Sequence, residues 1–304
     1  RRDRIRAGGM LRGTAGVIGG QLKMDLGEKA VPELVKGLGQ FGAEDFAEAI
    51  MTTDSFRKIA STEVELNGGR VALCGMAKGA GMICPNMATM LSTLLCDAKV
   101  EAGLWKKLLK EAVELTFNRA SVDGDTSTND TVYALANGLS GVEVTEADAP
   151  ALLAAMTEVL GKLAYMLVQD GEGATKVIRI KVRGAKSEGD AERIARSIGH
   201  SPLVKTAMFG QDANWGRIVC ALGYSGAEFD PAKAVLKICG VEVFRNEQPV
   251  KQTPDGGDDP KLVAALKERD ILIELQLGDG NAGYDFLASD LTHEYVTING
   301  DYRS

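Results

Sequence analysis

Thr89, a threonine that follows a short turn, is a candidate nucleophile in this sequence. The stretch "CPNMATML" runs from Cys84 to Leu91 and places Thr89 between a Pro-Asn turn and an apolar run. A threonine at a chain terminus can use its own α-amine as general base, because that amine has a pKa of about 7.7 to 8.0. Attack of the Thr89 hydroxyl on the carbonyl of Ala88 would form an ester, and its hydrolysis would create this terminus.

The same eight residues have a second interpretation. A β-branched residue at the start of a buried strand often does nothing more than pack well. A tight turn that strains the Ala88–Thr89 bond and a strand that fixes the hydroxyl would favour cleavage. The residue types alone leave both interpretations open.

Other catalytic chemistries find little support. The two histidines, His200 and His293, have no serine, cysteine or carboxylate at a recognisable catalytic spacing, and no His/Cys/carboxylate cluster has metal-ligand spacing. The string "DGDTSTND" at 123–130 resembles a calcium loop, but it lacks the final glutamate and has its glycine at the second position. A hydrogen-bonded structural loop is the favoured interpretation. We expect no metal and no cofactor.

Two glycine-rich segments could serve an acyl-transfer site. The segment "GTAGVIGG" at 13–20 lacks the spacing of a dinucleotide-binding loop. Its backbone N–H groups could still face a developing oxyanion. The segment "AKGAGMICPN" brings Lys78 close to a flexible turn just before Thr89.

Composition narrows the class of protein. The 304 residues carry a formal net charge of -7 with mixed charges, so we expect no nucleic-acid partner. The apolar run at 151–168 is interrupted by Glu158 and Lys162, which predicts an amphipathic helix and no membrane span.

Five cysteines without a CxxC pair indicate reduced thiols in the cytoplasm. The start "RRDRIRAGG" has neither Met nor a signal-like apolar stretch, which indicates a fragment or a processed piece.

Helices and strands alternate without a regular βαβ period. A hairpin is predicted around Asn67–Gly69, and a strand is predicted directly after Thr89. The other expected helices lie at 26–40, 43–51, 101–120, 145–169 and 190–198, and the other expected strands at 175–182, 217–223, 234–244, 271–277 and 294–300. This mixture predicts an α/β or α+β fold, a layered sandwich of mixed sheets with helices.

Several long motifs in order resemble one known family. They are "KGAGMICPNMATML", "FNRASVDGDTSTNDT", "QDGEGATK", "SPLVKTAMFGQDANWGRI" and "INGDYRS". Together they resemble the ornithine acetyltransferase family, also called bifunctional glutamate N-acetyltransferase, over essentially the whole chain. The resemblance implies the DmpA-like layered fold of that family. Family members carry further residues ahead of the equivalent of Arg1, so the chain resembles a member without its N-terminal part.

The resemblance implies an enzyme of arginine biosynthesis that cleaves itself before Thr89. Residues 1–88 would form the end of an α chain and residues 89–304 a β chain, and the two chains would pair into an α2β2 assembly. Thr89 would take the acetyl group from N2-acetylornithine and pass it to glutamate in a ping-pong reaction. Some members also use acetyl-CoA as donor.

The family's substrate contacts correspond to six positions of this chain. They are Thr52, Lys78, Thr89, Glu172, Asn299 and Ser304. Lys78 suits a substrate carboxylate and Glu172 an ammonium, while Thr52 and Asn299 supply neutral hydrogen bonds.

One position departs from the family. Its oxyanion hole is formed by a Thr-Gly pair, whereas this chain has Ala15 before Gly16. Loss of one oxyanion donor typically costs about a hundred- to a thousandfold in kcat. Either Thr14 replaces it or catalysis is weakened. Ala15 and the missing N-terminal part therefore leave a weakened or inert relative as one alternative. An amidohydrolase or aminopeptidase with the same fold and nucleophile, which uses another acyl donor or water, is the other.

Overall fold

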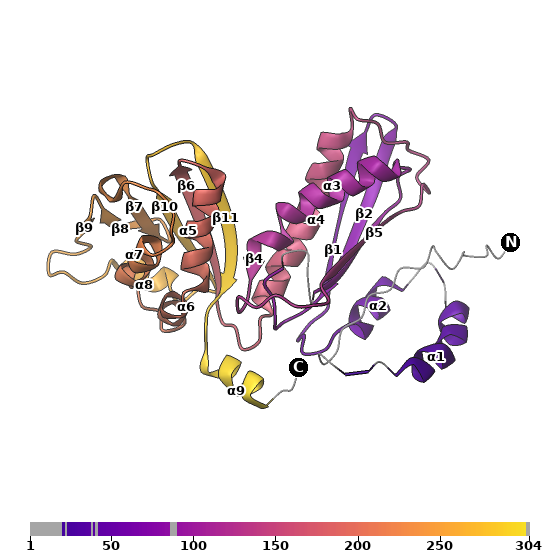
Figure 1. Cartoon of the computed structure of the whole chain (residues 1–304), viewed down its shortest axis with the longest axis horizontal. Helices are drawn as coiled ribbons and strands as arrows, with labels where there is room; N and C mark the ends of the chain where they lie inside the picture. Colours follow the sequence, from indigo (N-terminus) through magenta and orange to yellow (C-terminus); the bar gives the residue numbers. More distant parts are fainter. Residues whose placement is uncertain (1–19, 22, 38, 40–41, 86–89, 302–304) are drawn as a thin grey trace.

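The computed structural model describes residues 20–301, apart from residues 22, 38, 40–41 and 86–89. Its chain forms two β-sheets with helices packed on them (Figure 1). The α-helices are α1 (Met24–Lys36), α2 (Ala43–Ala49), α3 (Ala102–Glu114), α4 (Ala149–Gln169), α5 (Glu188–His200), α6 (Pro202–Phe209), α7 (Trp215–Gly223), α8 (Pro260–Ala265) and α9 (His293–Asp301), with short 3-10 turns η2 (Phe117–Arg119) and η3 (Pro231–Lys233). The strands are β1 (Lys58–Leu66), β2 (Gly69–Lys78), β3 (Leu91–Cys96), β4 (Ala120–Ser121), β5 (Thr131–Ala136), β6 (Val177–Ala185), β7 (Val235–Ile238), β8 (Val241–Arg245), β9 (Gln248–Pro249), β10 (Asp270–Gln276) and β11 (Ala282–Ser289).

The first sheet has the strand order β1-β2-β3-β5. Strands β1 and β2 form an antiparallel hairpin in which Leu66 lies opposite Gly69, which confirms the predicted turn. Strand β3 is antiparallel to β2 and parallel to β5. Helix α4 lies against β1 and β2, and α3 packs on α4.

Helix α4 is the core helix of this half of the molecule. By length and composition it could cross a membrane, and it is the one such helix among the residues that the structure describes. Its apolar side chains pack on the sheet and on α3, while Glu158 and Lys162 stay half exposed and form an ion pair of 2.6 Å beside β1, where Glu158 also accepts the Thr62 hydroxyl at 3.1 Å. The predicted amphipathic helix is therefore confirmed. Its fully buried side chains include Leu152, Met156, Val159, Leu160, Leu163 and Leu167.

The second sheet has the strand order β4-β11-β6-β10-β7-β8-β9 and is also mixed. Strand β6 is parallel to β10 and antiparallel to β11. Helix α5 covers β6 and β11, and it approaches closely because Gly199 faces the ring of Phe286, where a Cβ would lie only 2.7 Å away. Mixed sheets with packed helices confirm the layered α+β class.

Two predicted strands are wrong, because both segments are helices. Residues 217–223 belong to α7, which begins where the Asn214 side chain accepts the Arg217 N–H, and its buried Ile218, Ala221 and Leu222 have helical spacing. Residues 294–300 belong to α9, where the β-branched residues Val296, Thr297 and Ile298 suggested a strand. Tertiary packing overrode local propensity in α7, whereas α9 buries no residue, and its helix shows that β-branched composition alone does not determine a strand.

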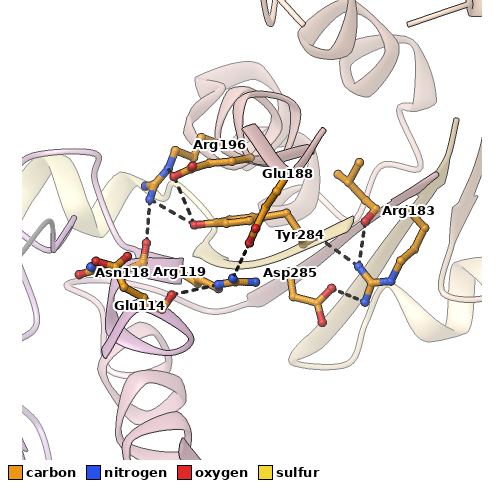
Figure 2. A network of polar contacts seen from close by, with 10 residues as sticks. Glu114, Asn118, Arg119, Arg183, Glu188, Arg196, Tyr284 and Asp285 are labelled. Atoms are coloured by element: carbon orange, nitrogen blue, oxygen red, sulfur yellow. Dashed lines mark hydrogen bonds and ion pairs between the residues drawn. The ribbon is translucent and has the colours of Figure 1, made fainter. Parts of the chain in front are cut away.

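A polar network beside α5 joins η2, which follows α3, to α5 and to β11 of the second sheet (Figure 2). Arg196 of α5 donates to the carbonyl of Asn118 at 2.7 Å, and Arg119 donates to Glu188 at 3.0 Å. The Arg119 guanidinium also lies 4.3 Å from the ring centre of Tyr284 in β11. Strand β4 follows Arg119 directly and pairs with β11, so the chain itself crosses between the two units here.

Candidate active site

Strand β3 begins two residues after Thr89 and lies in the middle of the first sheet. The register places Lys78, the last residue of β2, opposite Leu91, the first residue of β3. Ala88 and Thr89 themselves lie outside the described residues. Met90, only 1% exposed, is the first described residue after them. Strand pairing therefore brings a predicted substrate contact to the end of the strand that follows the predicted nucleophile.

The loop that resembles a calcium site holds the backbone on both sides of that segment. Asp123 accepts the N–H groups of Met82 and Ile83 at 2.7 and 3.0 Å. Asp130 accepts the N–H of Met90. Burial raises the pKa of Asp123 and raises that of Asp130 to about 6. The carboxylates of Asp123 and Asp130 thus accept backbone hydrogen bonds, which agrees with the interpretation of 123–130 as a structural loop.

Lys78 is a buried cation with a neutral partner. Its residue is 4% exposed, and its Nζ donates to Thr52 Oγ1 at 3.2 Å. No carboxylate of the described residues forms a salt bridge with it. Burial lowers the pKa of Lys78, which reflects the cost of an ammonium away from water.

Glu172 is the matching buried anion. Its residue is 9% exposed, its Oε2 accepts from Asn299 Nδ2 at 2.8 Å, and its backbone N–H donates to the carbonyl of Ala80 at 2.9 Å. The described part of the chain offers it no cationic partner either. Gly81 lies against the carboxylate, which a Cβ at that position would collide with. Glycine is therefore required where the loop after β2 passes Glu172.

The two charges lie close enough to contact one small ligand. Lys78 precedes Gly81 by three residues, and three residues span at most about 11 Å. A buried charge without an opposite partner is costly, so such groups are typical of binding and catalytic sites. An ammonium on one side and a carboxylate on the other suit a ligand that carries both a carboxylate and an ammonium. No group of acidic, Cys or His side chains in the described ranges could hold a metal ion.

The structure thus brings four predicted substrate contacts together in two contacting pairs. Thr52 with Lys78 and Glu172 with Asn299 are connected through the short segment that follows β2. The predicted oxyanion residues Ala15 and Gly16 lie outside the described residues. The predicted contact Ser304 does as well.

Sequence reasoning missed the helix and tyrosine that hold Asn299 in place. Tyr295, one turn earlier in α9, directs its hydroxyl toward Asp123 at 3.5 Å. Burial, followed by the nearby carboxylates, raises the pKa of Tyr295 to about 12. The motif "INGDY" carried a signal for Asn299, but nothing in the sequence connected this segment with residue 123.

A Cys-His contact was also missed. Cys84 Sγ lies 3.8 Å from His200 Nε2, although the two residues are 116 positions apart. Burial, with Arg196 and Lys205 nearby, lowers the pKa of His200 to about 4, so its imidazole is neutral near pH 7. A catalytic pair needs a third group that orients the base, and the charged groups that act on His200 are both cationic. The contact packs the loop before Thr89 against α5.

Comparison with known proteins gives consistent matches. A family model described as the ArgJ family matches residues 4–304. An arginine biosynthesis bifunctional protein ArgJ from Nitratidesulfovibrio vulgaris is 57% identical over 99% of this chain and 75% of its own length. A mitochondrial protein of the same name from Schizosaccharomyces japonicus is 43% identical over 96% of this chain and 68% of its own. A crystal structure of the Bacillus halodurans protein is 38% identical with a TM-score of 0.64, covering 69% of this chain and 97% of the solved chain.

Proposed function

The chain belongs to the ArgJ family and is a glutamate N-acetyltransferase of arginine biosynthesis, and we propose that Thr89 is the residue that carries the acetyl group. The Thr89 hydroxyl first attacks the carbonyl carbon of Ala88. The bond from that carbon to the Thr89 nitrogen breaks, and the nitrogen becomes a free amine. Water then hydrolyses the Ala88 ester, which leaves residues 1–88 and 89–304 as two chains.

Acetyl transfer follows in two steps. The α-amine of Thr89 takes the hydroxyl proton, and the oxygen attacks the acetyl carbonyl of N2-acetylornithine. Ornithine leaves with a proton, and the acetyl group remains as an ester on Thr89. The amine of glutamate then attacks this ester, which releases N-acetylglutamate and restores the hydroxyl.

One observation carries this proposal: Lys78 and Glu172 are buried without an opposite charge among the described residues, Lys78 opposite Leu91 at the start of β3 and Glu172 bonded to Ala80, two residues after Lys78. Lys78 would bind the carboxylate of acetylornithine, and Glu172 its side-chain ammonium. Thr52 and Asn299 would orient these two groups through the hydrogen bonds described above. Burial strengthens such interactions because water competes less for the charges.

The length of the solved Bacillus halodurans chain agrees with the size of the proposed β chain. The solved chain covers 69% of this chain with nearly all of its own length. It therefore has about the length of residues 89–304, which we propose as the β chain, with residues 1–88 as part of the α chain.

The remaining features of the proposal follow the family. Ala15 and Gly16 would supply backbone N–H groups to the oxyanion, without the hydroxyl that a threonine at position 15 would add. Ser304 would complete the substrate contacts at the chain end. We propose an α2β2 assembly in the cytoplasm that needs no cofactor, with acetyl-CoA as a second donor.

Intact-mass measurement of the purified chain tests the nucleophile. We expect two fragments with a cut directly before Thr89, and a mass increase of one acetyl group on the second fragment after incubation with acetylornithine. The variant Thr89→Ala should remain uncut and unlabelled. Thr93→Ala, four residues further along the chain in β3, is the matched control and should behave like the parent chain.

Two outcomes would contradict the proposal. One is a parent chain that stays uncut under native conditions, and the other is a Thr89→Ala variant that still cleaves or transfers acetyl groups. Release of free acetate without any N-acetylglutamate would instead identify a hydrolase of the same fold.

A further inference from the structure

A buried cation lies between two buried carboxylates behind the proposed substrate site. Lys58, the first residue of β1, is 0% exposed, and its Nζ donates to Asp54 Oδ1 and Asp170 Oδ2, each at 2.6 Å. The two acidic side chains are 0% and 4% exposed. We name Asp54, Lys58 and Asp170 the Lys58 triad. Three charges in the interior contribute little net stability in most proteins, so a role in geometry is the better explanation.

Asp54 connects the triad to both contacts on the carboxylate side of the site. Its Oδ2 accepts the backbone N–H of Thr52 at 3.1 Å, and its Oδ1 accepts the N–H of Gly79, next to Lys78, at 2.6 Å. Burial opposes ionisation, but these N–H groups and Lys58 hold the pKa of Asp54 below its usual range. The ionised carboxylate is therefore the form that fixes these two segments.

Asp170 connects the triad to the ammonium side. It lies two residues before Glu172 and accepts the N–H of Ser55 at 3.0 Å and also the Ser55 hydroxyl. Lys58 holds this carboxylate from the other side. The residues around Glu172 are thereby tied to the same short segment that carries Thr52.

The triad also acts on the charge of Lys78. Burial lowers the pKa of Lys78, Asp54 raises it, and Lys58 lowers it again. The carboxylates of Asp54 and Asp170 balance the ammonium groups of Lys58 and Lys78 when all four groups are ionised. The ammonium of Lys78 is thus kept in the interior without a direct salt bridge to any described residue and stays available to a ligand.

We propose that the Lys58 triad is a positioning device that sets the separation between Lys78 and Glu172 and so selects the length of the diamino-acid substrate. This inference rests on the proposed substrate contacts and adds three residues that act through them. A ligand with one methylene fewer or more would reach only one of two fixed charges. Rigid support behind binding groups is what such length selection requires.

The test compares acetyl transfer from N2-acetylornithine with that from its homologues one methylene shorter and one longer. The parent chain should prefer acetylornithine in kcat/KM by about tenfold or more, the usual effect of one methylene. In Asp54→Asn this preference should fall several-fold, because the segment of Thr52 and the N–H of Gly79 lose their shared anion. A purely structural role would lower the activity toward all three donors alike.

Asp148→Asn is the matched control. Asp148 is also buried, and it accepts backbone N–H groups of Asn67 and Thr145 at 3.0 Å, away from the proposed site. We expect it to change thermal stability and leave the donor preference at the parent value. If Asp54→Asn does not fold, Ser55→Ala, which removes one hydrogen bond to Asp170, should shift the preference in the same direction.

A folded Asp54→Asn or Ser55→Ala variant with the parental preference would overturn the inference and leave the proposed function intact. A parent chain that transfers no acetyl group, or that treats the three donors equally, would contradict the proposed substrate contacts and this inference with them.

Discussion

At the scale of single residues, Lys78 and Glu172 differ from ordinary buried charges. Lys58 and Lys205 are equally buried, but the first has two carboxylates and the second has carbonyl oxygens of Val122 and Ser289 at 2.6 Å. Such partners offset the cost of removing a charge from water. Lys78 and Glu172 have only a hydroxyl and an amide among the described residues, and in the function that we propose the substrate's charges offset the remaining cost.

Replacing Glu172 by Gln tests the ammonium contact. The variant keeps the shape of the side chain and an acceptor for Asn299 but removes the charge. We expect the KM for acetylornithine to rise about ten- to a hundredfold, since a hydrogen bond to a charged group is worth about 1.5 to 3 kcal/mol. The KM for glutamate should not rise, because glutamate carries a carboxylate where ornithine carries its ammonium. Steady-state kinetics with each substrate varied in turn measures both values.

The control for this prediction is Glu294→Gln. Glu294 is an exposed residue of α9 in the same part of the molecule. It should leave both KM values unchanged. An unaltered KM for acetylornithine in Glu172→Gln would remove the ammonium contact from the mechanism.

At the scale of elements, α9 is held by a glycine in the loop after α4. The carbonyl of Gly173 accepts the Thr292 hydroxyl at 2.8 Å, and that hydroxyl accepts the N–H of Tyr295 at 3.2 Å. Gly173 has a φ of +67°, and a Cβ there would lie 2.5 Å from the Tyr295 nitrogen. The close approach is what allows Asn299 to reach Glu172.

Gly173→Ala should therefore displace α9. Left-handed backbone costs an alanine about 1 kcal/mol, and the contact with Tyr295 forces the helix away in addition. We expect faster amide hydrogen exchange across 293–301 and a KM for acetylornithine about tenfold higher, because Glu172 loses its amide partner. Hydrogen-exchange mass spectrometry and kinetics on one preparation report both effects.

Gly226→Ala is the control that separates the cost of a left-handed backbone from the cost of the contact with Tyr295. Gly226 has a similar φ of +73°, but nothing lies within 4 Å of the position of its Cβ. The variant should lose a comparable amount of stability while exchange in α9 and the KM stay at parental values. Equal effects from both variants would mean that α9 does not depend on this contact.

At the scale of the whole molecule, the network of Figure 2 connects η2, the turn that follows α3, with α5 and β11 of the second sheet. The side chain of Arg196 is 27% exposed, and its guanidinium is shared between Glu192, the carbonyl of Asn118 and the ring of Phe286, whose centre is 5.2 Å away. Its loss would leave the carbonyl of Asn118 without this donor. The first sheet with α3 and the second sheet with α5 would then be coupled less tightly.

Arg196→Ala should lower the free energy of unfolding by about 2 kcal/mol, because a partly buried charged hydrogen bond and its packing are lost together. Thermal melting should fall by about 4 °C. Arg193→Ala is the control, since Arg193 is 53% exposed and pairs with Asp190 on its own helix. An exposed pair contributes at most about 1 kcal/mol. Equal losses in the two variants would argue against coupling through Arg196.

The sequence by itself determined the local features whose cause lies within a few residues. The turn residues Asn67–Gly69 predicted the hairpin, and the apolar run after Met90 predicted a strand. The spacing of apolar residues around Glu158 predicted an amphipathic helix. Ordered motifs gave the family and the four predicted substrate contacts that the structure brings together in two hydrogen-bonded pairs. Each of these signals is a hydrophobic periodicity, a turn sequence or a sequence motif, and none depends on a residue far away in the chain.

Only the tertiary structure decided which distant residues meet. Helices α7 and α9 both carry β-branched residues typical of strands, and only α7 buries an apolar face, that of Ile218, Ala221 and Leu222. The Lys58 triad joins residues 112 positions apart, and Asn299 meets Glu172 across 127. No local period encodes such contacts, because they form when two sheets and their helices bury their apolar faces and leave a few charges to find partners inside.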